Sequence, residues 1–539
     1  MVSRPCGLRL HLAGSPRWSC RGAAAPRPAR TRISLLRVGV VLLSTAVVGW
    51  TGTRAISAAV TTAPKPGPSN FASYVDVTAT PTYPFETPSD PAQSNVILSF
   101  VVAGPDNRCA ATWGGAYTLN QAASQLDLDR RISQLRLVGG TARVSFGGQT
   151  GNELASACTA PMALLEAYQS VVDRYKLDSI DLDLEGASLE DTSAAGRRAT
   201  AIKGLQDHVR AAGRSLAVWL TLPVSATGLT APGASVVAGM LSAGVNLAGV
   251  NGMTMDFGAV STPTQPQSKT VINASTALHA QVRSAFAQAG QPIDDGQAWA
   301  KVGIIPMIGQ NDVASEQFTL MDAVTVNQFA RAQGVGQLSM WSLNRDSTCG
   351  PPLPTALPVV QTSCSGIDQG TQRFANVLAA DLASTFTALL PPPAGGGRSP
   401  TPTPNLSPMP QIVDEPAHSP FPIWDPLGTY PAGTKIVWHH QVFNARYWTT
   451  GFSPDTPVAN AKDSPWTLVG PVLPGETPAP MPTLPVGTYP QWNPTQAYAA
   501  GSRVQLGLVP YKAKWWSQRQ EPGLSFAGGS PWLLVLPGT

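Results

Sequence analysis

The stretch DSIDLDLEG, residues 178 to 186, decides the fold prediction. Asp181, Asp183 and Glu185 occupy every second position, and aliphatic residues fill the positions between them. Because side chains alternate between the two faces of a β-strand, the stretch predicts a strand with one acidic and one aliphatic face. In a barrel the aliphatic face would pack against helices and the acids would face the interior. Three ionised carboxylates would repel one another there, so we expect at least one retained proton and a raised pKa at Glu185.

The alternative interpretations of these acids are a calcium site, a salt-bridge cluster or a solvated edge strand. A calcium site would need a run of oxygen ligands at loop spacing, and no such run accompanies the acids. We therefore predict no metal site.

Apolar, β-rich runs alternate with longer helical patterns from about residue 70 to 390, which is typical of repeated βα units and a parallel sheet. Eight such units favour a closed (β/α)8 barrel, the TIM-barrel form of the α/β class, and an open doubly wound sheet is the competing arrangement. The predicted strands are 73 to 79, 95 to 103, 142 to 148, 179 to 185, 215 to 223, 247 to 256, 301 to 307 and 337 to 343. Helical patterns include 161 to 175, 194 to 213 and 271 to 290.

The 539 residues are too many for one core and predict a chain of several domains. The net charge of +4 is misleading, because eight arginines and no acid lie within residues 1 to 37 and the rest is slightly acidic. Nucleic-acid binding would need basic residues on the folded domains, so no nucleic-acid partner is expected.

The basic start is followed by the apolar run VGVVLLSTAVVGW, residues 38 to 50, and then by small residues. This order is typical of an export signal, and the run is short for a membrane span of roughly 20 residues. We expect residues 1 to 60 to be a signal peptide of a secreted protein. An uncleaved anchor that holds the protein at the outer face of the cytoplasmic membrane is the alternative. Residues 61 to 69 form a short linker.

Four cysteines lie outside this leader, which suits an oxidising compartment. Of the three possible pairings we favour Cys109 with Cys158 and Cys349 with Cys364, since each closes a loop between neighbouring elements. Free buried thiols are the alternative. No CxxC motif occurs and the histidines do not cluster with cysteines, which argues against zinc.

Two Pro-rich segments, 391 to 422 with eleven prolines and 471 to 490 with seven, predict extended spacers. They separate two related segments, 423 to 470 and 491 to 536, that align at a constant offset of 68 residues. The offset pairs Tyr447 with Trp515 and Trp448 with Trp516. Such a repeat predicts a duplicated all-β module of about 50 residues.

The acidic strand resembles the DxxDxDxE motif of glycoside hydrolase family 18, the chitinase family, and the match is complete from Asp178 through Glu185. Three further segments resemble family motifs over the same barrel. SFGG includes Ser145, Gly147 and Gly148, MTMDFG includes Met255 and Asp256, and SMWSL includes Trp341.

By this resemblance Glu185 would protonate the leaving oxygen, and Asp183 would orient the 2-acetamido group of the substrate, which attacks the anomeric carbon. Asp181 would share a proton with Asp183. The configuration would be retained, as the family is an exception to the usual scheme of two protein carboxylates. Trp341 would form the floor of the site, and no cofactor is implied.

Met255 stands where the family has a tyrosine in MxYD, so a phenolic hydrogen bond to the acetamido group is missing, although Asp256 remains. Only about thirty residues separate the seventh predicted strand from the eighth. Family members with a deep tunnel insert a domain there, so we expect a shallow groove and internal, non-processive cleavage.

The repeated segments resemble the short chitin-binding modules of carbohydrate-binding families 5 and 12. Adjacent aromatics on a strand face opposite ways, so we expect one of each pair, Tyr447-Trp448 and Trp515-Trp516, to be exposed for stacking on a sugar. A purely structural role for every tryptophan is the alternative. We interpret His439 and His440 as exposed turn residues.

Together these features predict a secreted, monomeric chitinase that acts on chitin and chitooligosaccharides. An endo-β-N-acetylglucosaminidase acting on N-glycans and a non-catalytic chitin-binding lectin remain as alternatives. The paired modules argue against the first, and the intact acid set argues against the second.

Overall fold

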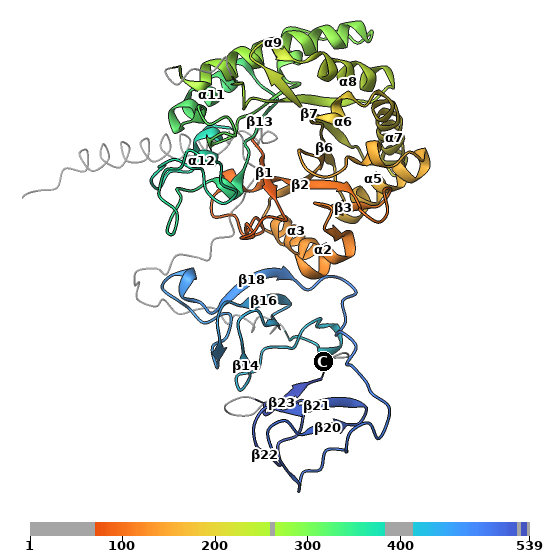
Figure 1. Cartoon of the computed structure of the whole chain (residues 1–539), viewed down its shortest axis with the longest axis vertical. Coiled ribbons are helices and arrows are strands. Elements are labelled where there is room, and N and C mark those ends of the chain that lie inside the picture. The colour runs from red at the N-terminus through yellow and green to blue at the C-terminus, as the bar shows by residue number, and fades with distance from the viewer. Residues whose placement is uncertain (1–70, 259–264, 383–412, 525–529, 536–539) are drawn as a thin grey trace, which may run out of the picture. The chain divides into compact units, whose positions relative to one another are not determined.

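The computed structural model describes residues 71–258, 265–382, 413–524 and 530–535 (Figure 1). The predicted leader, the linker 61 to 69 and most of the linker 391 to 422 lie outside these residues. None of the described helices combines the length and the apolar character needed to cross a membrane.

The first part of the described chain is a closed barrel of parallel strands. They are β1 (Ser73–Asp76), β2 (Asn95–Ala103), β5 (Thr141–Gly147), β6 (Ser179–Asp183), β7 (Ala217–Ser225), β9 (Leu247–Met253), β10 (Val302–Ile305) and β13 (Gln337–Leu338). Each pairs with the next, and the ring closes where the amides of Ala72 and Tyr74 donate to the carbonyls of Leu338 and Met340, at 3.1 and 3.2 Å. The predicted (β/α)8 barrel is confirmed, and the open sheet is wrong.

The helices surround these strands (Figure 1). They are α2 (Leu119–Gln125), α3 (Leu128–Leu137), α4 (Leu154–Ala157), α5 (Pro161–Tyr175), α6 (Ala187–Glu190), α7 (Thr192–Ala211), α8 (Ala231–Ser242), α9 (Gln267–Gln288), α10 (Asp295–Trp299), α11 (Leu320–Gln333) and α12 (Phe374–Leu378). The first connection, between β1 and β2, contains the short 3-10 helix η1 (Pro91–Gln93) instead of an α-helix.

Helix α5 shows how the sequence sets these elements. It begins with Pro161, whose fixed φ suits the first turn, and it ends before Lys176, which adopts a left-handed conformation. Its apolar face buries Leu164, Tyr168 and Val171 in the main core, against the aliphatic outer faces of the strands.

The barrel domain also contains short antiparallel strands. β3 (Ala111–Trp113) and β4 (Tyr117–Thr118) extend β2, β8 (Gly228–Leu229) pairs with β7, and β11 (Gly309–Gln310) pairs with β12 (Gln317–Phe318). The β11–β12 hairpin lies between β10 and α11 in the chain, where the sequence left no room for an inserted domain.

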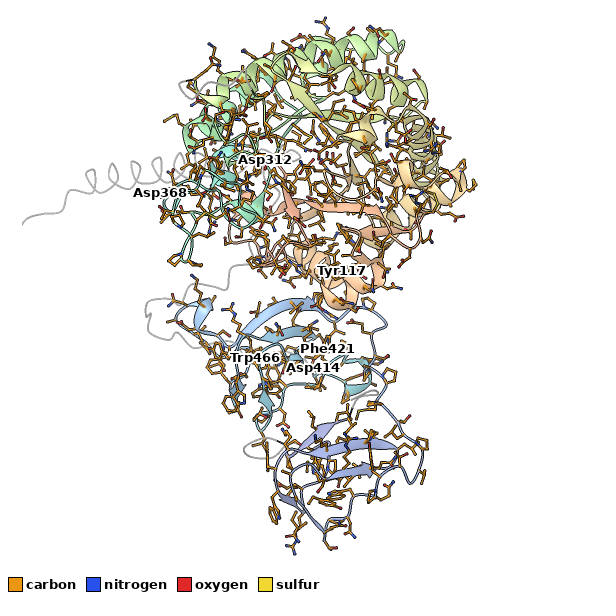
Figure 2. All side chains as sticks on the ribbon, in the orientation of Figure 1. Tyr117, Asp312, Asp368, Asp414, Phe421 and Trp466 are labelled. Carbon is orange, nitrogen blue, oxygen red and sulfur yellow. A yellow bond between two sulfur atoms is a disulfide. The ribbon has the colours of Figure 1, made fainter. Side chains whose placement is uncertain are left out.

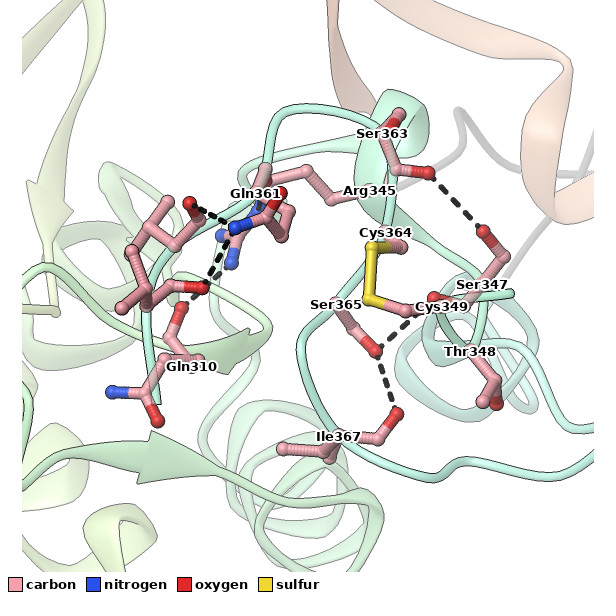
Figure 3. The surroundings of a disulfide bond; sticks show 12 residues. Gln310, Arg345, Ser347, Thr348, Cys349, Gln361, Ser363, Cys364, Ser365 and Ile367 are labelled. Carbon is pink, nitrogen blue, oxygen red and sulfur yellow. Dashed lines mark hydrogen bonds between the residues drawn. A yellow bond between two sulfur atoms is a disulfide. The ribbon is translucent and has the colours of Figure 1, made fainter. Parts of the chain in front are cut away.

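Both predicted disulfides, Cys109–Cys158 and Cys349–Cys364, are present. Figure 3 shows the second of these beside Arg345, the last residue of the short 3-10 helix η3 (Leu343–Arg345). The Arg345 side chain donates from Nε to the carbonyl of Gln361 at 2.9 Å and from Nη2 to the carbonyl of Gln310 at 2.6 Å. This arginine therefore joins the disulfide loop to the β11–β12 hairpin.

Two small all-β units follow, and they share one topology. The first contains β14 (Thr429–Tyr430), β15 (Lys435–Trp438), β16 (Gln441–Ala445), β17 (Thr449–Thr450) and β18 (Trp466–Pro471), with the 3-10 helices η4 (Pro416–His418) and η5 (Ala461–Asp463). The second contains β19 (Ala497–Tyr498), β20 (Arg503–Leu506), β21 (Val509–Ala513), β22 (Ser517–Gln518) and β23 (Trp532–Leu534). In each unit two strands pair separately from a sheet of three, as the repeat predicts.

Equivalent residues build the two small cores. Trp466, labelled in Figure 2, donates from its indole to the carbonyl of Phe452 at 2.8 Å, and Trp532 donates likewise to Gln520 at 2.7 Å. Tyr430 and Tyr498 pack edge-on against these two indoles. The closing tryptophan of each repeat is therefore a core residue with its polar atom satisfied.

Parts of both Pro-rich segments pack onto these units. Asp414 accepts hydrogen bonds from the amides of His439 and His440, and the amide of Val437 donates to Pro422. In the second segment the amide of Val472 donates to His440 and that of Leu484 donates to Leu508. The ordered units thus extend beyond the boundaries 423 to 470 and 491 to 536 that the repeat alone predicts.

Candidate active site

Strand β6 brings the acids to the barrel interior. Its residues pair with β5 and β7, placing Asp181 opposite Ser145 on one side and Trp219 on the other. Ile180 and Leu182 are fully buried in the outer core, so the alternation of faces predicted for this strand is confirmed. Glu185 lies two residues beyond the strand, at the C-terminal end of the barrel, where enzymes of this fold have their active sites.

Asp181 is fully buried and receives four hydrogen bonds. Its Oδ2 accepts from the hydroxyls of Tyr74 at 3.0 Å and Ser145 at 2.7 Å. Its Oδ1 accepts from the hydroxyl of Thr221 at 2.7 Å and the amide of Asn251 at 3.3 Å. All four partners can donate to the carboxylate form of Asp181. Burial raises the pKa of Asp181, and the hydrogen bonds from Ser145, Thr221 and Tyr74 lower it.

Asp183 lies in a different environment from Asp181. Its Oδ1 is shielded from solvent and has no hydrogen-bond partner among the described residues. Burial raises the pKa of Asp183 well above its usual range, and the nearby charges of Glu185 and Asp181 raise it further. Of the two acids on β6, Asp183 is therefore the one more readily protonated.

Glu185 is partly exposed at the rim of the same pocket. Burial raises the pKa of Glu185 to about 7, a hydrogen bond with Asp183 lowers it, and the charges of Asp256 and Asp312 raise it. A carboxyl group that keeps its proton near neutral pH can act as a general acid.

These groups line a pocket of about 110 Å³. Its apolar wall includes Phe100 and Trp341, whose rings stack with centroids 5.5 Å apart. The full lining consists of Tyr74, Phe100, Gln149, Asp183, Glu185, Thr221, Met253, Met255, Asp256, Ile305, Met307, Asp312 and Trp341. A flat aromatic floor beside a buried acid suits the apolar face of a sugar ring.

Met255 and Asp256 both reach this pocket. Met255 packs in a cluster with Tyr74, Phe100 and Trp341, so its position supplies carbon and sulfur atoms and no hydroxyl donor. Asp256 has a left-handed backbone with φ of 52°, and its Oδ1 accepts from the amide of Val313 at 3.0 Å. Burial raises the pKa of Asp256, and the charge of Asp312 contributes to the rise.

The two glycines of the SFGG segment lie where a side chain would collide with residues of the site. Gly147 has a φ of +106°, and a Cβ there would lie 2.0 Å from the carbonyl oxygen of Asp183. A Cβ on Gly148 would lie 2.8 Å from the ring of Phe100. Asp178 is placed differently: its side chain is 80% exposed and pairs with Arg214 at 3.0 Å, away from the pocket.

Several residues in or near this site were not predicted from the sequence: Tyr74, Thr221, Asn251, Asp312 and Arg345. Thr221 and Asn251 are polar residues at inward positions of otherwise apolar strands, a signal that could have identified them. Asp312 lies in the β11–β12 hairpin of the barrel domain (Figure 2). Burial lowers the pKa of Arg345 to about 10, and the charges of Asp312 and Asp256 oppose this change.

The aromatic pairs of the small units differ from expectation. Tyr447 and Trp448 are 48% and 60% exposed, and Trp515 and Trp516 are 43% and 61% exposed. The prediction that one member of each pair faces a core is wrong, because β16 and β21 end at Ala445 and Ala513 and the pairs lie in the bends that follow. The alternative that every tryptophan is a core residue is also wrong.

His439 and His440 form the turn between β15 and β16, both with left-handed φ, at 50° and 59°. This arrangement agrees with the turn expected from the sequence. Within the described residues no group of three or more His, Cys, Asp or Glu side chains is placed to hold a metal ion.

No protein-family model matches this chain, whereas curated proteins and solved structures do. The probable bifunctional chitinase/lysozyme of Escherichia coli (strain K12) is 36% identical over 309 residues, covering 56% of this chain and 33% of that protein. Endochitinase 11 of Metarhizium anisopliae is 34% identical over 324 residues, covering 59% of this chain and 58% of that protein.

Among solved structures, the catalytic domain of a hyperthermophilic chitinase from Pyrococcus furiosus is 26% identical, with a TM-score of 0.49, and the match covers 58% of this chain and 95% of that one. This chain spans about a third and somewhat more than half of the lengths of the two curated relatives. Over more than half of its own length, the chain is therefore similar in sequence to proteins described as chitinases.

Proposed function

We propose that this protein is a glycoside hydrolase that cleaves the β-1,4 links between N-acetylglucosamine units of chitin. The observation that carries the proposal is the pairing of two acids at the C-terminal end of the barrel. Glu185, with a pKa of about 7, lies beside Asp183, the more readily protonated acid of β6, inside the same pocket. The similarity to curated chitinases supports the choice of substrate.

In the proposed reaction Glu185 gives its proton to the glycosidic oxygen as the bond to the anomeric carbon breaks. The carbonyl oxygen of the substrate's acetamido group attacks that carbon and forms an oxazolinium ion, which Asp183 orients and stabilises. Water then adds to the anomeric carbon after losing a proton to Glu185, which restores the acid and retains the configuration.

The same scheme limits the substrate. Because the nucleophile is the acetamido group, the sugar at the reacting position must be N-acetylated. The pocket gives this group an apolar wall of Met255 and Trp341. Since Met255 offers no hydroxyl, any donor to the acetamido oxygen would come from another lining residue, and Gln149 is the exposed amide there.

We further propose internal cleavage by a secreted protein. The connection from β10 to β13 holds only the β11–β12 hairpin and α11, which supports a shallow groove. The exposed aromatic pairs of the two small units support binding to an insoluble polymer. A digest whose soluble products are one disaccharide from the first minutes would contradict internal cleavage.

The decisive experiment is hydrolysis of a chromogenic chitooligosaccharide by the wild type, by Glu185→Gln and by Glu190→Gln. Glu190 is an exposed residue of α6 and serves as the matched control. We expect turnover by the wild type and the control, and a loss of at least about 10²-fold in Glu185→Gln. An inactive wild type that still binds chitin would favour a lectin, and a fully active Glu185→Gln would refute the assignment of the acid.

A further inference from the structure

A positive charge lies inside the barrel, one layer below the acids. Arg143 is on β5, two residues before Ser145, so both side chains point into the barrel. A strand rises by about 3.3 Å per residue, which places the backbone of Arg143 roughly 6.6 Å below that of Ser145. Ser145 in turn donates to Asp181 at 2.7 Å.

Neighbouring strands hold the guanidinium group of Arg143. Its Nη1 donates to the side-chain oxygen of Gln337 on β13, and Gln337 donates to the hydroxyl of Ser339 at 2.9 Å. Its Cζ lies 5.6 Å from the centre of the Trp219 ring on β7. Trp219 is paired in register with Asp181. The guanidinium of Arg143 therefore lies near the layer of inward-facing side chains to which Asp181 belongs.

These contacts leave part of the guanidinium unpaired. The Nε of Arg143 is shielded from solvent and has no hydrogen-bond partner among the described residues. Arg143 is half-buried, and a guanidinium that is partly shielded from water is stabilised by a nearby negative charge.

We propose that Arg143 is a positioning residue that holds Asp181 as a carboxylate and so keeps the proton of this acid pair on Asp183. The inference rests on the proposed function, since it explains how that site is prepared for reaction. Arg143 is too deep to touch a substrate in the pocket, and it is absent from the pocket lining.

The charges around Asp181 agree with this role. Burial raises the pKa of Asp181, while hydrogen bonds from Ser145 and Thr221 and the charge of Arg143 lower it. The other titratable groups that face Asp181 are Tyr74 on β1 and Asp183 on its own strand, and Asn251 on β9 is neutral. Arg143 is therefore the cation that faces this carboxylate from the strands around it.

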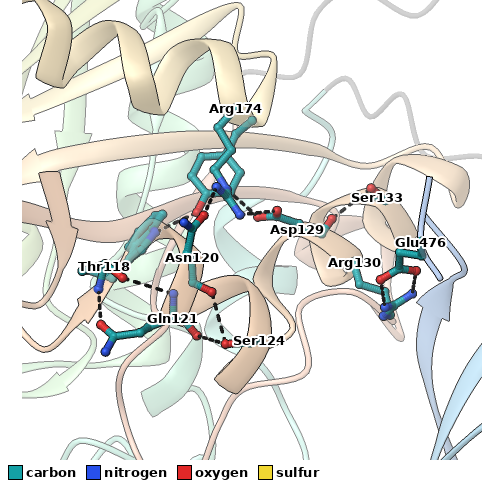
Figure 4. A network of polar contacts seen from close by, with 11 residues as sticks. Thr118, Asn120, Gln121, Ser124, Asp129, Arg130, Ser133, Arg174 and Glu476 are labelled. Carbon is teal, nitrogen blue, oxygen red and sulfur yellow. Dashed lines mark hydrogen bonds and ion pairs between the residues drawn. The ribbon is translucent and has the colours of Figure 1, made fainter. Parts of the chain in front are cut away.

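The test compares the pH dependence of kcat/KM for the wild type, Arg143→Gln and Arg143→Lys on a chromogenic chitooligosaccharide. Removing a positive charge raises the pKa of a nearby acid, so the acidic limb of Arg143→Gln should move to higher pH by about one unit. Arg143→Lys retains the positive charge, so the acidic limb of its kcat/KM profile should stay at the wild-type pH. Arg174→Gln, which breaks the pair with Asp129 on the outer helices (Figure 4), is the control for loss of an arginine and should leave the limb in place.

A second measurement needs no substrate and separates this inference from the proposed function. In the full chain with ¹³C-labelled aspartate, the carboxyl resonance lost in Asp181→Asn identifies Asp181. Its titration should move to higher pH in Arg143→Gln even if the wild type hydrolyses nothing. If the titration of Asp181 is the same in Arg143→Gln as in the wild type, Arg143 has a structural role only and the proposal is overturned. The same conclusion follows if the activity of Arg143→Gln falls while the acidic limb of kcat/KM stays at the same pH.

Stability provides a third test if Arg143→Gln folds poorly. Should the two charges compensate each other, Asp181→Asn will partly restore the melting temperature of Arg143→Gln, since the double variant leaves no unbalanced charge. A double variant that melts below both single variants would contradict the proposal.

Discussion

At the scale of single residues, the groups around Glu185 set its pKa. Burial has the largest effect, and the charges of Asp256 and Asp312 act in the same direction. Asp181 is buried like its neighbour Asp183, but it accepts four hydrogen bonds, and those from hydroxyl groups lower its pKa. The number of hydrogen-bond donors around each carboxylate therefore distinguishes the two acids on the same strand face.

This environment predicts the basic limb of the pH profile. Glu185 must be protonated to act as an acid, so kcat should fall as pH rises through about 7. Asp312→Asn removes a negative charge that raises the pKa of Glu185, so the basic limb should move to lower pH. The measurement is kcat against pH, with the exposed Asp106→Asn as control. A limb that stays in place in Asp312→Asn would show that Asp312 does not influence Glu185.

Gly147 gives a prediction about stability. An alanine there would need a φ of +106° and would place its Cβ 2.0 Å from a backbone carbonyl oxygen that cannot rotate away. We expect Gly147→Ala to lower the free energy of unfolding by about 3 kcal/mol. Gly239→Ala in α8 is the matched control, because no atom lies within 4 Å of its Cβ. That change should stabilise the helix by about 0.5–1 kcal/mol, and equal effects at both sites would contradict the argument.

The acids were predictable from the sequence, but the residues that shift their pKa values were not. The period of two placed Asp181 and Asp183 on the inner face because a strand pattern fixes direction locally. Asp312 and Arg345 come from connections whose paths depend on contacts with distant segments, such as the carbonyl of Gln361. No local pattern encodes such contacts.

At the scale of elements, the strands were predictable where apolar runs were long. The ranges predicted for β2 and α5 agree with the structure, and β6 ends at Asp183, two residues before the prediction. The eighth strand, predicted as 337 to 343, is regular only at Gln337–Leu338. Beyond it, pairing with the neighbouring strands continues as single contacts, including the bridge between Met307 and Trp341. An apolar sequence predicts burial there but not where regular pairing ends.

The loop between Cys349 and Cys364 gives a prediction at this scale. It is closed by a disulfide with a sequence separation of 15, and Arg345 ties it to the carbonyl of Gln310. Replacing both cysteines by serine should lower the stability of the barrel by about 3 kcal/mol, measured by urea unfolding of the full chain. It should also lower kcat, because Gln310 lies two residues before Asp312. Unchanged stability and activity would show that the hydrogen bonds alone hold the loop.

At the scale of the whole molecule, the repeat was predictable because its landmark residues build equivalent cores. Tyr430 and Trp466 in one unit correspond to Tyr498 and Trp532 in the other. The exposure of both aromatics in each pair was not predictable, since it depends on where β16 and β21 end. Exposed aromatics on units this small are costly unless they serve binding.

Within each unit the two aromatic residues differ in their contacts and exposure. The hydroxyl of Tyr447 donates to the carbonyl of Asp463 at 2.9 Å, and the ammonium of Lys514 lies 4.6 Å from the ring centre of Trp515. Trp448 and Trp516 are the most exposed member of each pair. We therefore expect them to carry most of the binding to an insoluble polymer.

Trp448→Ala and Trp516→Ala should each weaken binding to insoluble chitin by about tenfold, equivalent to 1.4 kcal/mol. The double variant should lose more affinity than either single variant, because two linked weak sites bind by avidity and each loss lowers it. Hydrolysis of soluble chitooligosaccharides should stay unchanged in all three. Leu533→Ala, an apolar side chain 56% exposed on β23, is the control for loss of exposed apolar surface. If the double variant bound chitin as tightly as the control, the aromatic pairs would not be the binding surface and the polymer would have to be held by the barrel.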